Sequence, residues 1–346
     1  MNALTEPLAT GGERTQLLDL INASWTTQAI RTACVLRVPE LLAAGASDAE
    51  ALARGAGCEA RSMRRLLRAL ATLGVCSEGD DGRYRLGALG TWLCEEHPQS
   101  LRAWALLTGG VIWQRWSELD QSVRSGISHR RRHGGDDGFD NLAQDPVAAA
   151  QFHRAMIEIT RPVAHAVASA IDASGIARVV DVGGGSGELI AQVLAAHRSL
   201  HGVLFDLPHG LDGATAVLEA AGVVARCTSV AGSFFDGVPE GGDLYLLKSV
   251  LHNWDDERCV QILLCCRAAM APGGRVCVIE RVVSDRIGTS ARDRAVARSD
   301  LNMLVALSGR ERRRGDFRTL FETAGLAIQP DLGTAGEFCV LQARAA

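Results

Sequence analysis

The stretch RVVDVGGGSG, residues 178–187, decides the fold of this chain. An apolar run of strand character ends in three consecutive glycines, and a segment with helical periodicity, residues 186–196, follows directly. Glycines allow the backbone to turn tightly and allow a ligand to approach the main chain. A strand, a glycine turn and a helix in this order predict the opening unit of a doubly wound α/β domain.

Similar alternation continues to the end of the sequence. Helical segments such as 186–196 and 256–270 separate apolar runs at 178–182, 202–206, 225–230, 243–249, 275–280 and 338–343. Nearly continuous apolar strands between helices predict a mostly parallel sheet that helices cover on both faces. We therefore expect a Rossmann-like domain whose ligand site lies at the carboxyl ends of the strands.

The pattern before this region is different. Residues 17–96 read as short amphipathic helices, of which 61–73 is the clearest, followed by a hairpin around Gly79–Gly82. Ser47 and Glu50 have the spacing of a capping box for an earlier helix. We expect a helical, winged-helix-like domain over 1–100 and the α/β domain with connecting helices over 101–346. The polar, glycine-rich stretch 124–140 is expected to be a loop.

Composition excludes several classes of protein. The 346 residues carry 36 Lys and Arg against 40 Asp and Glu, a net charge of −4 that provides no general attraction to nucleic acid or anionic lipid. No apolar run is long enough to span a membrane, and the N-terminus lacks the pattern of an export signal. We therefore expect a cytoplasmic protein, with its ten cysteines present as free thiols.

The glycine loop favours one kind of cofactor. A dinucleotide fingerprint would place a third glycine where this chain has Glu188, which counts against NAD. Asp181 would repel a pyrophosphate but would suit a ligand that carries an ammonium and a sulfonium group. S-adenosylmethionine is such a ligand, and Asp181, Gly183 and Gly185 are candidate binding residues.

Two further strand ends fit the same cofactor. Asp206 ends the second predicted strand, where an acidic residue can accept hydrogen bonds from ribose hydroxyls. Ser233 and Phe234 follow the third strand, and the aromatic ring could lie on the adenine.

The segment LKSVLHNWDD, residues 247–256, is the most specific motif in the chain. His252 lies just past the carboxyl end of the fourth predicted strand, beside the expected cofactor crevice. Imidazole has a pKa that suits proton abstraction near neutral pH. Methyl transfer to a weakly acidic hydroxyl needs one base and precise placement of the reactants.

Together these motifs resemble a known enzyme family. DVGGGSG, FDLP, GSFF, LKSVLHNWDD, PGGRVCVIE and SGRERRRGDF occur in the order and spacing of the S-adenosylmethionine-dependent O-methyltransferases of the caffeic-acid type and their bacterial relatives in antibiotic pathways. The resemblance covers almost the whole chain. It implies methylation of a small aromatic hydroxyl compound, release of S-adenosylhomocysteine, and an N-terminal domain that forms an intertwined homodimer without nucleic acid or membrane partners.

Residue roles follow from the matching positions. The resemblance implies that His252 is the general base and that Glu280 and Glu311 flank its imidazole. Gly183, Gly185, Asp206, Phe234 and Lys248 match cofactor positions, whereas Ser233 stands where the family usually has an aspartate that binds the adenine amino group. The positions that correspond to the acceptor pocket are Trp113, Met156, Trp254, Asn302 and Met303. We expect no metal site.

Two other functions remain open at this stage. A protein with this fold could use the bound cofactor for hydroxylation, decarboxylation or a pericyclic step. The arginines of the helix 61–73 could instead belong to a DNA-binding regulator that senses a small molecule. One sequence does not identify the acceptor, because side chains from several helices would form its pocket.

Overall fold

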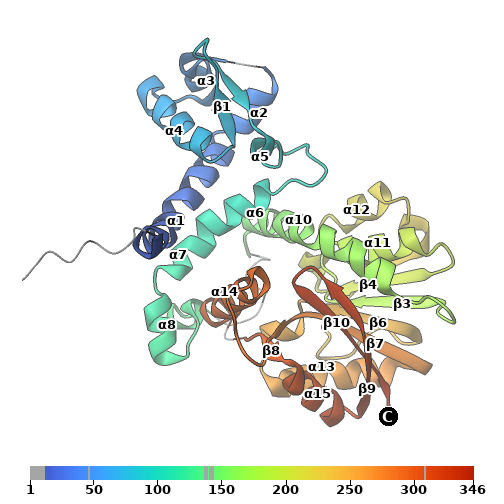
Figure 1. The fold of residues 1–346 in the computed structure, drawn as a ribbon. Helices are drawn as coiled ribbons and strands as arrows, with labels where there is room; N and C mark the ends of the chain where they lie inside the picture. The colour runs from blue at the N-terminus through green and yellow to red at the C-terminus, as the bar shows by residue number, and fades with distance from the viewer. Residues whose placement is uncertain (1–11, 46, 136–138, 140–143, 308) are drawn as a thin grey trace, which may run out of the picture. The chain divides into compact units, whose positions relative to one another are not determined.

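The computed structural model describes residues 12–45, 47–135, 139, 144–307 and 309–346 (Figure 1). The chain divides into two compact units, Met1–Val111 and Ile112–Ala346. Among the described residues, no helix combines the length and the apolar content that a bilayer span requires.

The first unit consists of helices and one small hairpin. Its elements are α1 (Gly12–Val35), α2 (Val38–Ala43), α3 (Ala49–Ala56), α4 (Ala60–Thr72), β1 (Cys76–Glu78), β2 (Tyr84–Leu86), α5 (Ala88–Thr91) and α6 (Arg102–Leu107), followed by a π-helical turn over Thr108–Ile112. Met63, Leu67 and Leu70 of α4 are buried in the core of this unit, as the helical spacing predicts. The predicted hairpin is also present, with Cys76 paired to Leu86.

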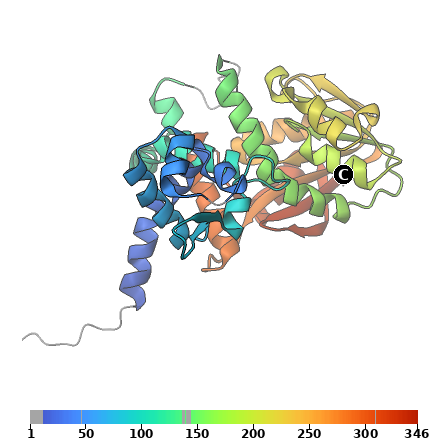
Figure 2. The same ribbon diagram turned by 90° about the horizontal axis from the view of Figure 1, so that it is seen from above.

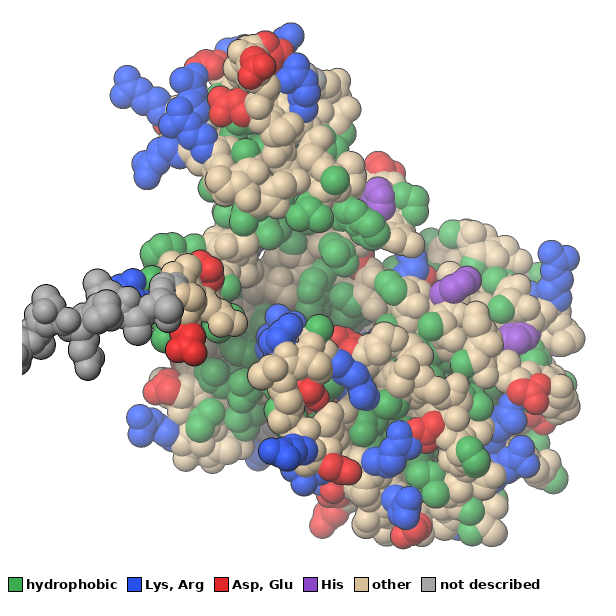
Figure 3. All heavy atoms as spheres, in the orientation of Figure 1, with side chains coloured by type: hydrophobic (Ala, Val, Ile, Leu, Met, Phe, Trp, Pro, Cys, Tyr) green, Lys and Arg blue, Asp and Glu red, His purple; other side chains and the backbone are tan. Residues whose placement is uncertain are grey.

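The polar face of α4 carries the arginines that favoured the DNA-binding alternative. Arg61, Arg64, Arg65 and Arg68 are all exposed, and Figure 3 shows Lys and Arg side chains gathered over this helix. Arg64 is paired with Glu50 of α3. The basic face is therefore solvated and partly neutralised.

The predicted capping box is wrong. The backbone of Ser47 pairs with Tyr84 of β2, with a Tyr84 N to Ser47 O distance of 2.8 Å, which holds Ser47 outside the helix. Asp48 is the N-cap of α3 instead, and its Oδ1 accepts from Ala51 N at 2.7 Å.

The predicted loop 124–140 is also partly wrong, because helical turns enter it. The second unit begins with α7 (Trp113–Trp116), α8 (Leu119–Ser125) and α9 (His129–Arg132). Ser128 caps α9, and Glu118 binds Arg132 and His133, so local hydrogen bonds outweigh the glycine-rich composition. Residues 136–138 and 140 of the predicted loop lie outside the described residues.

A mostly parallel sheet forms the centre of the second unit. Its strands are β3 (Arg178–Val182), β4 (His201–Asp206), β5 (Cys227–Ala231), β6 (Gly242–Lys248), β7 (Met270–Val283), β9 (Leu326–Ala335) and β10 (Phe338–Ala345), in the spatial order β5-β4-β3-β6-β7-β10-β9. The short β8 (Arg312–Arg313) pairs with the end of β7. β10 runs antiparallel to both of its neighbours, and the pairings among β3 to β7 are parallel.

Helices cover both faces of this sheet, as predicted. They are α10 (Pro146–Ala170), α11 (Glu188–Ala196), α12 (Ala214–Ala220), α13 (Asp256–Ala269) and α15 (Arg314–Thr323), with 3₁₀ turns at Pro208–Leu211, Val224–Arg226 and Leu251–Asn253. The remaining helix, α14 (Ala291–Ala306), contacts β7 and packs against α7, α8 and α9. Val179 packs toward α10 and α11, whereas Val180 packs toward α13 and α15, because successive strand residues face opposite sides. Figure 2, seen from above, shows α10 and α11 in front of the strands.

The strand order fixes the position of the ligand site. From β3 the chain continues to β4 on one side, and it later returns through β6 on the other side. The connections that leave the carboxyl ends of β3 and β6 run in opposite directions, toward β4 and β7, and such a switch point forms the ligand crevice of a doubly wound sheet.

Candidate active site

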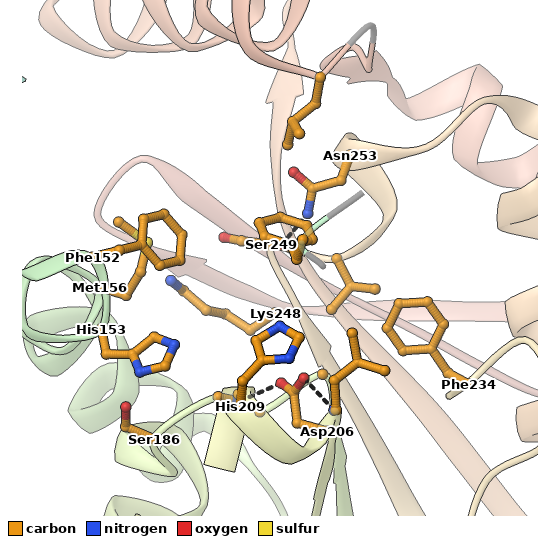
Figure 4. Close-up of a pocket in the computed structure, with 18 of the residues that line it drawn as sticks. Phe152, His153, Met156, Ser186, Asp206, His209, Phe234, Lys248, Ser249 and Asn253 are labelled. Carbon is orange, nitrogen blue, oxygen red and sulfur yellow. Dashed lines mark hydrogen bonds between the residues drawn. The ribbon is translucent and has the colours of Figure 1, made fainter. Parts of the chain in front are cut away.

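A cavity of about 1060 Å³ lies at this switch point. Asp181 and the glycines that follow β3, Asp206 from β4, and Lys248 from β6 line it. In Figure 4, α10 carries Phe152, His153 and Met156 on one side of the cavity, and Phe234 lies on the other side.

The glycine loop after β3 adopts a backbone that requires glycine. Gly183, Gly185 and Gly187 have φ values of 67°, 56° and 81°, in the left-handed region. A Cβ on Gly183 would lie 2.9 Å from Val250 Cγ2. Because these positions carry no side chains, the loop presents its backbone to the cavity. Side chains on the same residues would occupy the space of the cavity.

Asp206 is fixed against this loop by its two carboxylate oxygens. Oδ2 accepts from Gly185 N and Oδ1 accepts from Leu207 N, both at 2.7 Å. Each oxygen keeps a second lone pair for a ligand hydroxyl. Burial raises the pKa of Asp206 above its ordinary value.

Asp181 and Lys248 are buried charged groups beside the cavity. Burial raises the pKa of Asp181 to about 7, and its Oδ2 has no hydrogen-bond partner among the described residues. Burial lowers the pKa of Lys248 to about 8, and its Nζ donates to Thr160 Oγ1 at 2.9 Å. A buried acceptor without a partner is costly unless a ligand donor satisfies it.

His252 is held by two glutamates from distant parts of the chain. It lies in the 3₁₀ turn Leu251–Asn253 after β6; its Nδ1 is 3.1 Å from Glu311 Oε1 and 3.5 Å from Glu280 Oε2. Glu280 belongs to β7, and Glu311 directly precedes β8. Ser299 Oγ also donates to Glu311 Oε1, at 2.6 Å. The Nδ1 contact to a carboxylate assigns the proton to Nδ1 and leaves Nε2 as an acceptor.

These three groups shift one another's protonation. Burial lowers the pKa of His252, but Glu280 and the hydrogen bond to Glu311 outweigh burial and raise it above its ordinary value. Burial raises the pKa of Glu280. Burial also acts to raise the pKa of Glu311, but the hydrogen bonds from His252 and Ser299 hold it below its ordinary value.

Comparison with known proteins now decides the family. The O-methyltransferase domain model matches residues 116–327, and the O-methyltransferase dimerisation domain model matches residues 18–96. The chain belongs to the O-methyltransferase family.

Several relatives match this O-methyltransferase over almost their whole length. The phenazine O-methyltransferase PhzM of Lysobacter antibioticus is 35% identical and covers 95% of both chains. O-demethylpuromycin-O-methyltransferase of Streptomyces alboniger is 38% identical over 92% of this chain and 85% of its own length. Aclacinomycin 10-hydroxylase RdmB of Streptomyces purpurascens is 34% identical over 88% and 82%.

Solved structures agree with these relatives. The crystal structure of LaPhzM has a TM-score of 0.91 at 34% identity and covers 96% of this chain and 99% of its own. NcsB1 from neocarzinostatin biosynthesis, in complex with S-adenosylmethionine and 2-hydroxy-5-methyl naphthoic acid, has a TM-score of 0.78 at 34% identity and covers 93% and 96%. The family is S-adenosylmethionine-dependent, so the fold, the enzyme class and the cofactor predicted from the sequence are confirmed.

The residues of this O-methyltransferase fit the cofactor. Asp206 offers free lone pairs for ribose hydroxyls, and the unpartnered oxygen of Asp181 can accept from a ligand donor. Ser233 lines the cavity, but its Oγ accepts from Phe235 N at 3.3 Å, so its lone pairs are already partly used. The cavity is lined by nine of the predicted residues: Met156, Asp181, Gly183, Gly185, Asp206, Ser233, Phe234, Lys248 and Trp254.

Other predicted site residues of the O-methyltransferase do not line this cavity. The side chain of His252 is 8% exposed, and its neighbour Asn253 lines the cavity instead. Trp113 is exposed on α7, Met303 is buried in α14, and Asn302 Oδ1 accepts from Trp116 Nε1 at 2.9 Å. Trp254, which does line the cavity, packs edge-on against Phe234 and Phe235. The acceptor-binding roles of these residues stay predictions.

The sequence analysis missed several lining residues. His153 precedes Met156 by three positions on α10, so its helical spacing could have placed it on the same face. His209 follows Asp206 by three residues, in the turn Pro208–Leu211. Arg258 lies over the rings of Trp254 and Phe235, at 5.1 and 5.4 Å, and its contact with Phe235, 23 residues earlier, left no sequence signal.

Proposed function

We propose that the protein methylates a hydroxyl group of a small phenolic or enolic natural product, with His252 as the general base and without a metal. The observation that carries the proposal is the contact of His252 Nδ1 with Glu311, which leaves Nε2 free to take a proton. The relatives named for phenazine, puromycin and naphthoic acid substrates support an aromatic acceptor.

His252, its two glutamates and the residues that line the cavity would have separate roles in the reaction. Bound S-adenosylmethionine supplies an electrophilic methyl group on a sulfonium. His252 Nε2 takes the proton from the acceptor hydroxyl while the oxygen forms the new bond to carbon, and the electron pair of the broken C–S bond stays on sulfur. Glu311 and Glu280 stabilise the imidazolium that results. Asp206 and the glycine loop would hold the cofactor, and Lys248 and Asp181 lie beside it.

The test is the variant His252→Ala on a phenol of ordinary pKa, about 10. We expect kcat to fall by roughly two to four decades while cofactor affinity stays nearly unchanged, because the proposed role of the imidazole is proton transfer and it does not line the cofactor cavity. The loss should be smaller for Glu280→Gln and smallest for Glu311→Gln, which orient the ring and take no proton. His197→Ala is the matched control. His197 contacts Ala168 O through its Nε2 and lies far in the sequence from His252, Glu280 and Glu311. Full activity of His252→Ala would overturn the general-base role.

Metal removal tests a separate part of the proposal. His252, Glu280 and Glu311 have the mutual spacing of a possible metal site. We expect chelators to leave the rate unchanged, because proton transfer to His252 needs no metal and the Nδ1 atom of His252 already contacts Glu311. A loss of activity with chelator that Zn²⁺ or Mg²⁺ restores would contradict the metal-free mechanism.

A second candidate function is hydroxylation, which the relative named aclacinomycin 10-hydroxylase favours. Mass spectrometry of the product distinguishes the two functions, since one adds a methyl group and the other an oxygen atom. If the cofactor binds and no phenol is methylated by the wild type, this second function takes first place.

A further inference from the structure

Arg312 is a fully buried arginine next to the catalytic turn. Its side chain is 0% exposed, and its backbone is fixed where β8 pairs with Val282 of β7. Burying a guanidinium is costly unless its donors find acceptors. Its partners therefore indicate why the charge is kept there.

Those partners are the carbonyls of the turn that carries His252. Nη1 donates to Leu251 O at 2.8 Å, and Nη2 donates to Trp254 O at 2.7 Å. Nε and Nη2 both donate to Asp256 Oδ1, at 2.9 and 2.7 Å. The planar guanidinium thus connects the start of the turn, its end and the first residue of α13.

The same segment also binds the carbonyl of His252 itself. Arg310 N donates to His252 O at 2.9 Å, and a Cβ on Gly309 would lie 2.1 Å from that oxygen. On the opposite side, Glu280 Oε1 accepts from Leu251 N and His252 N at 2.9 and 3.3 Å. Glu280 thus holds the amide groups of the turn, and residues 310–312 hold its carbonyl groups.

We propose that Arg312 is a positioning residue that sets the place of the His252 imidazole through the carbonyls of Leu251 and Trp254, with Asp256 as its counter-ion. Arg312 has no exposed surface and touches no reactant, so it acts only through His252. Glu311, one residue earlier, contacts the imidazole directly, so two consecutive residues hold the ring and the turn that carries it. This inference rests on the general-base role proposed for His252.

Arg312→Lys is the decisive variant, because it keeps the positive charge and loses the fork that reaches two carbonyls and a carboxylate. Arg310→Lys is the matched control, since Arg310 also binds Asp256, but through a half-exposed side chain that reaches no carbonyl of the turn. Asp256→Asn is a milder second variant at an exposed position, for use if Arg312→Lys does not fold.

The first measurement uses two acceptors, 1-naphthol and 4-nitro-1-naphthol, at a pH where only the second is ionised. In Arg312→Lys, a displaced His252 base should lower kcat roughly 10- to 100-fold on 1-naphthol. The loss should be less than about threefold on the nitro compound, which needs no base, with an unchanged KM for the cofactor. Equal losses on both acceptors would indicate general damage and would overturn the proposal, as would no loss.

The second measurement needs no acceptor. NMR titration of the histidines, with the His252 signal assigned by its absence in His252→Ala, should show its pKa falling toward the ordinary value in Arg312→Lys and staying unchanged in Arg310→Lys. Because Arg312→Lys keeps the positive charge, a lower pKa of His252 in this variant reports a loosened contact between His252 and Glu311. An unchanged His252 pKa in a folded Arg312→Lys or Asp256→Asn protein would contradict the inference. If the wild type methylates neither naphthol, only the proposed function is challenged, and the titration still decides this inference.

Discussion

Asp206 keeps free lone pairs at the carboxyl end of β4 and also accepts from Gly185 N in the glycine loop, so its removal should weaken cofactor binding. Asp206→Ala deletes the proposed acceptor for two ribose hydroxyls, so we expect binding to weaken by roughly 1.5–3 kcal/mol, about one to two decades in Kd. Calorimetric titration with S-adenosylhomocysteine measures the change. Asp212→Ala, at an exposed position six residues later, is the control, and equal affinities of the two variants would contradict the role of Asp206.

The glutamates around His252 should move the pH dependence of the rate. The imidazole acts in its neutral form, so kcat on an ordinary phenol should rise with pH through a pKa above the usual histidine value. Glu311→Gln removes an interaction that raises this pKa, so the rising limb should shift to lower pH. A pH–rate profile of both proteins measures the shift, and a limb that moves to higher pH would reverse our assignment of the sign.

At the scale of elements, α3 is capped by Asp48, one residue after the Ser47 that the sequence pattern predicted. Asp48→Ala removes the acceptor for Ala51 N, and we expect a loss of about 1 kcal/mol in the free energy of unfolding. Ser47→Ala should change little, since only the backbone of Ser47 is used. Urea unfolding followed by circular dichroism compares the two variants, and a larger loss for Ser47→Ala would restore the predicted capping box.

The sequence predicted those elements whose patterns are strong and local. The strand 178–182 matches β3, and the helix 61–73 lies within one residue of α4, because apolar periodicity and glycine turns determine both. β9 was missed, since it lies at the sheet edge and contains Pro330 and Gly333, which strand patterns exclude. Its pairing with β10 depends on tertiary contact.

The candidate site was predictable to the same extent. Gly183, Asp206 and His252 follow strands, so topology alone brings them to one edge of the sheet. Arg312 contacts carbonyls about 60 positions away in the sequence, and no local pattern distinguishes it from the surface arginines nearby. The orientation of Trp254 toward Phe235 likewise depends on packing across the second unit.

At the scale of the whole molecule, the first unit leaves a large apolar surface on α1. Leu20, Ile21 and Trp25 are 65%, 61% and 72% exposed, and residues 18–96 match the dimerisation domain model. Monomeric proteins rarely expose such a patch. We propose that it contributes to a homodimer, in agreement with the sequence-based expectation.

Charge on this surface should separate the protomers. Leu20→Glu combined with Trp25→Glu places carboxylates in the proposed interface, so we expect the mass measured by light scattering to fall from dimer to monomer. Val147→Glu, at an 80% exposed position of the second unit, is the control and should leave the mass unchanged. A double variant that keeps the mass of the wild type would contradict this placement of the interface.

The strand order of the sheet also constrains when the enzyme can form during synthesis. β10 is the last strand along the sequence, yet it lies between β7 and β9 and pairs with both. Until residues 338–345 have left the ribosome, both neighbours present unpaired edges, and open strand edges promote association with other chains. The first unit, by contrast, contains all of its own strands and core before residue 112 is made. The nascent second unit therefore stays exposed to aggregation until β10 is added, and termination between Ala335 and Phe338 would leave β9 without the strand that joins it to β7.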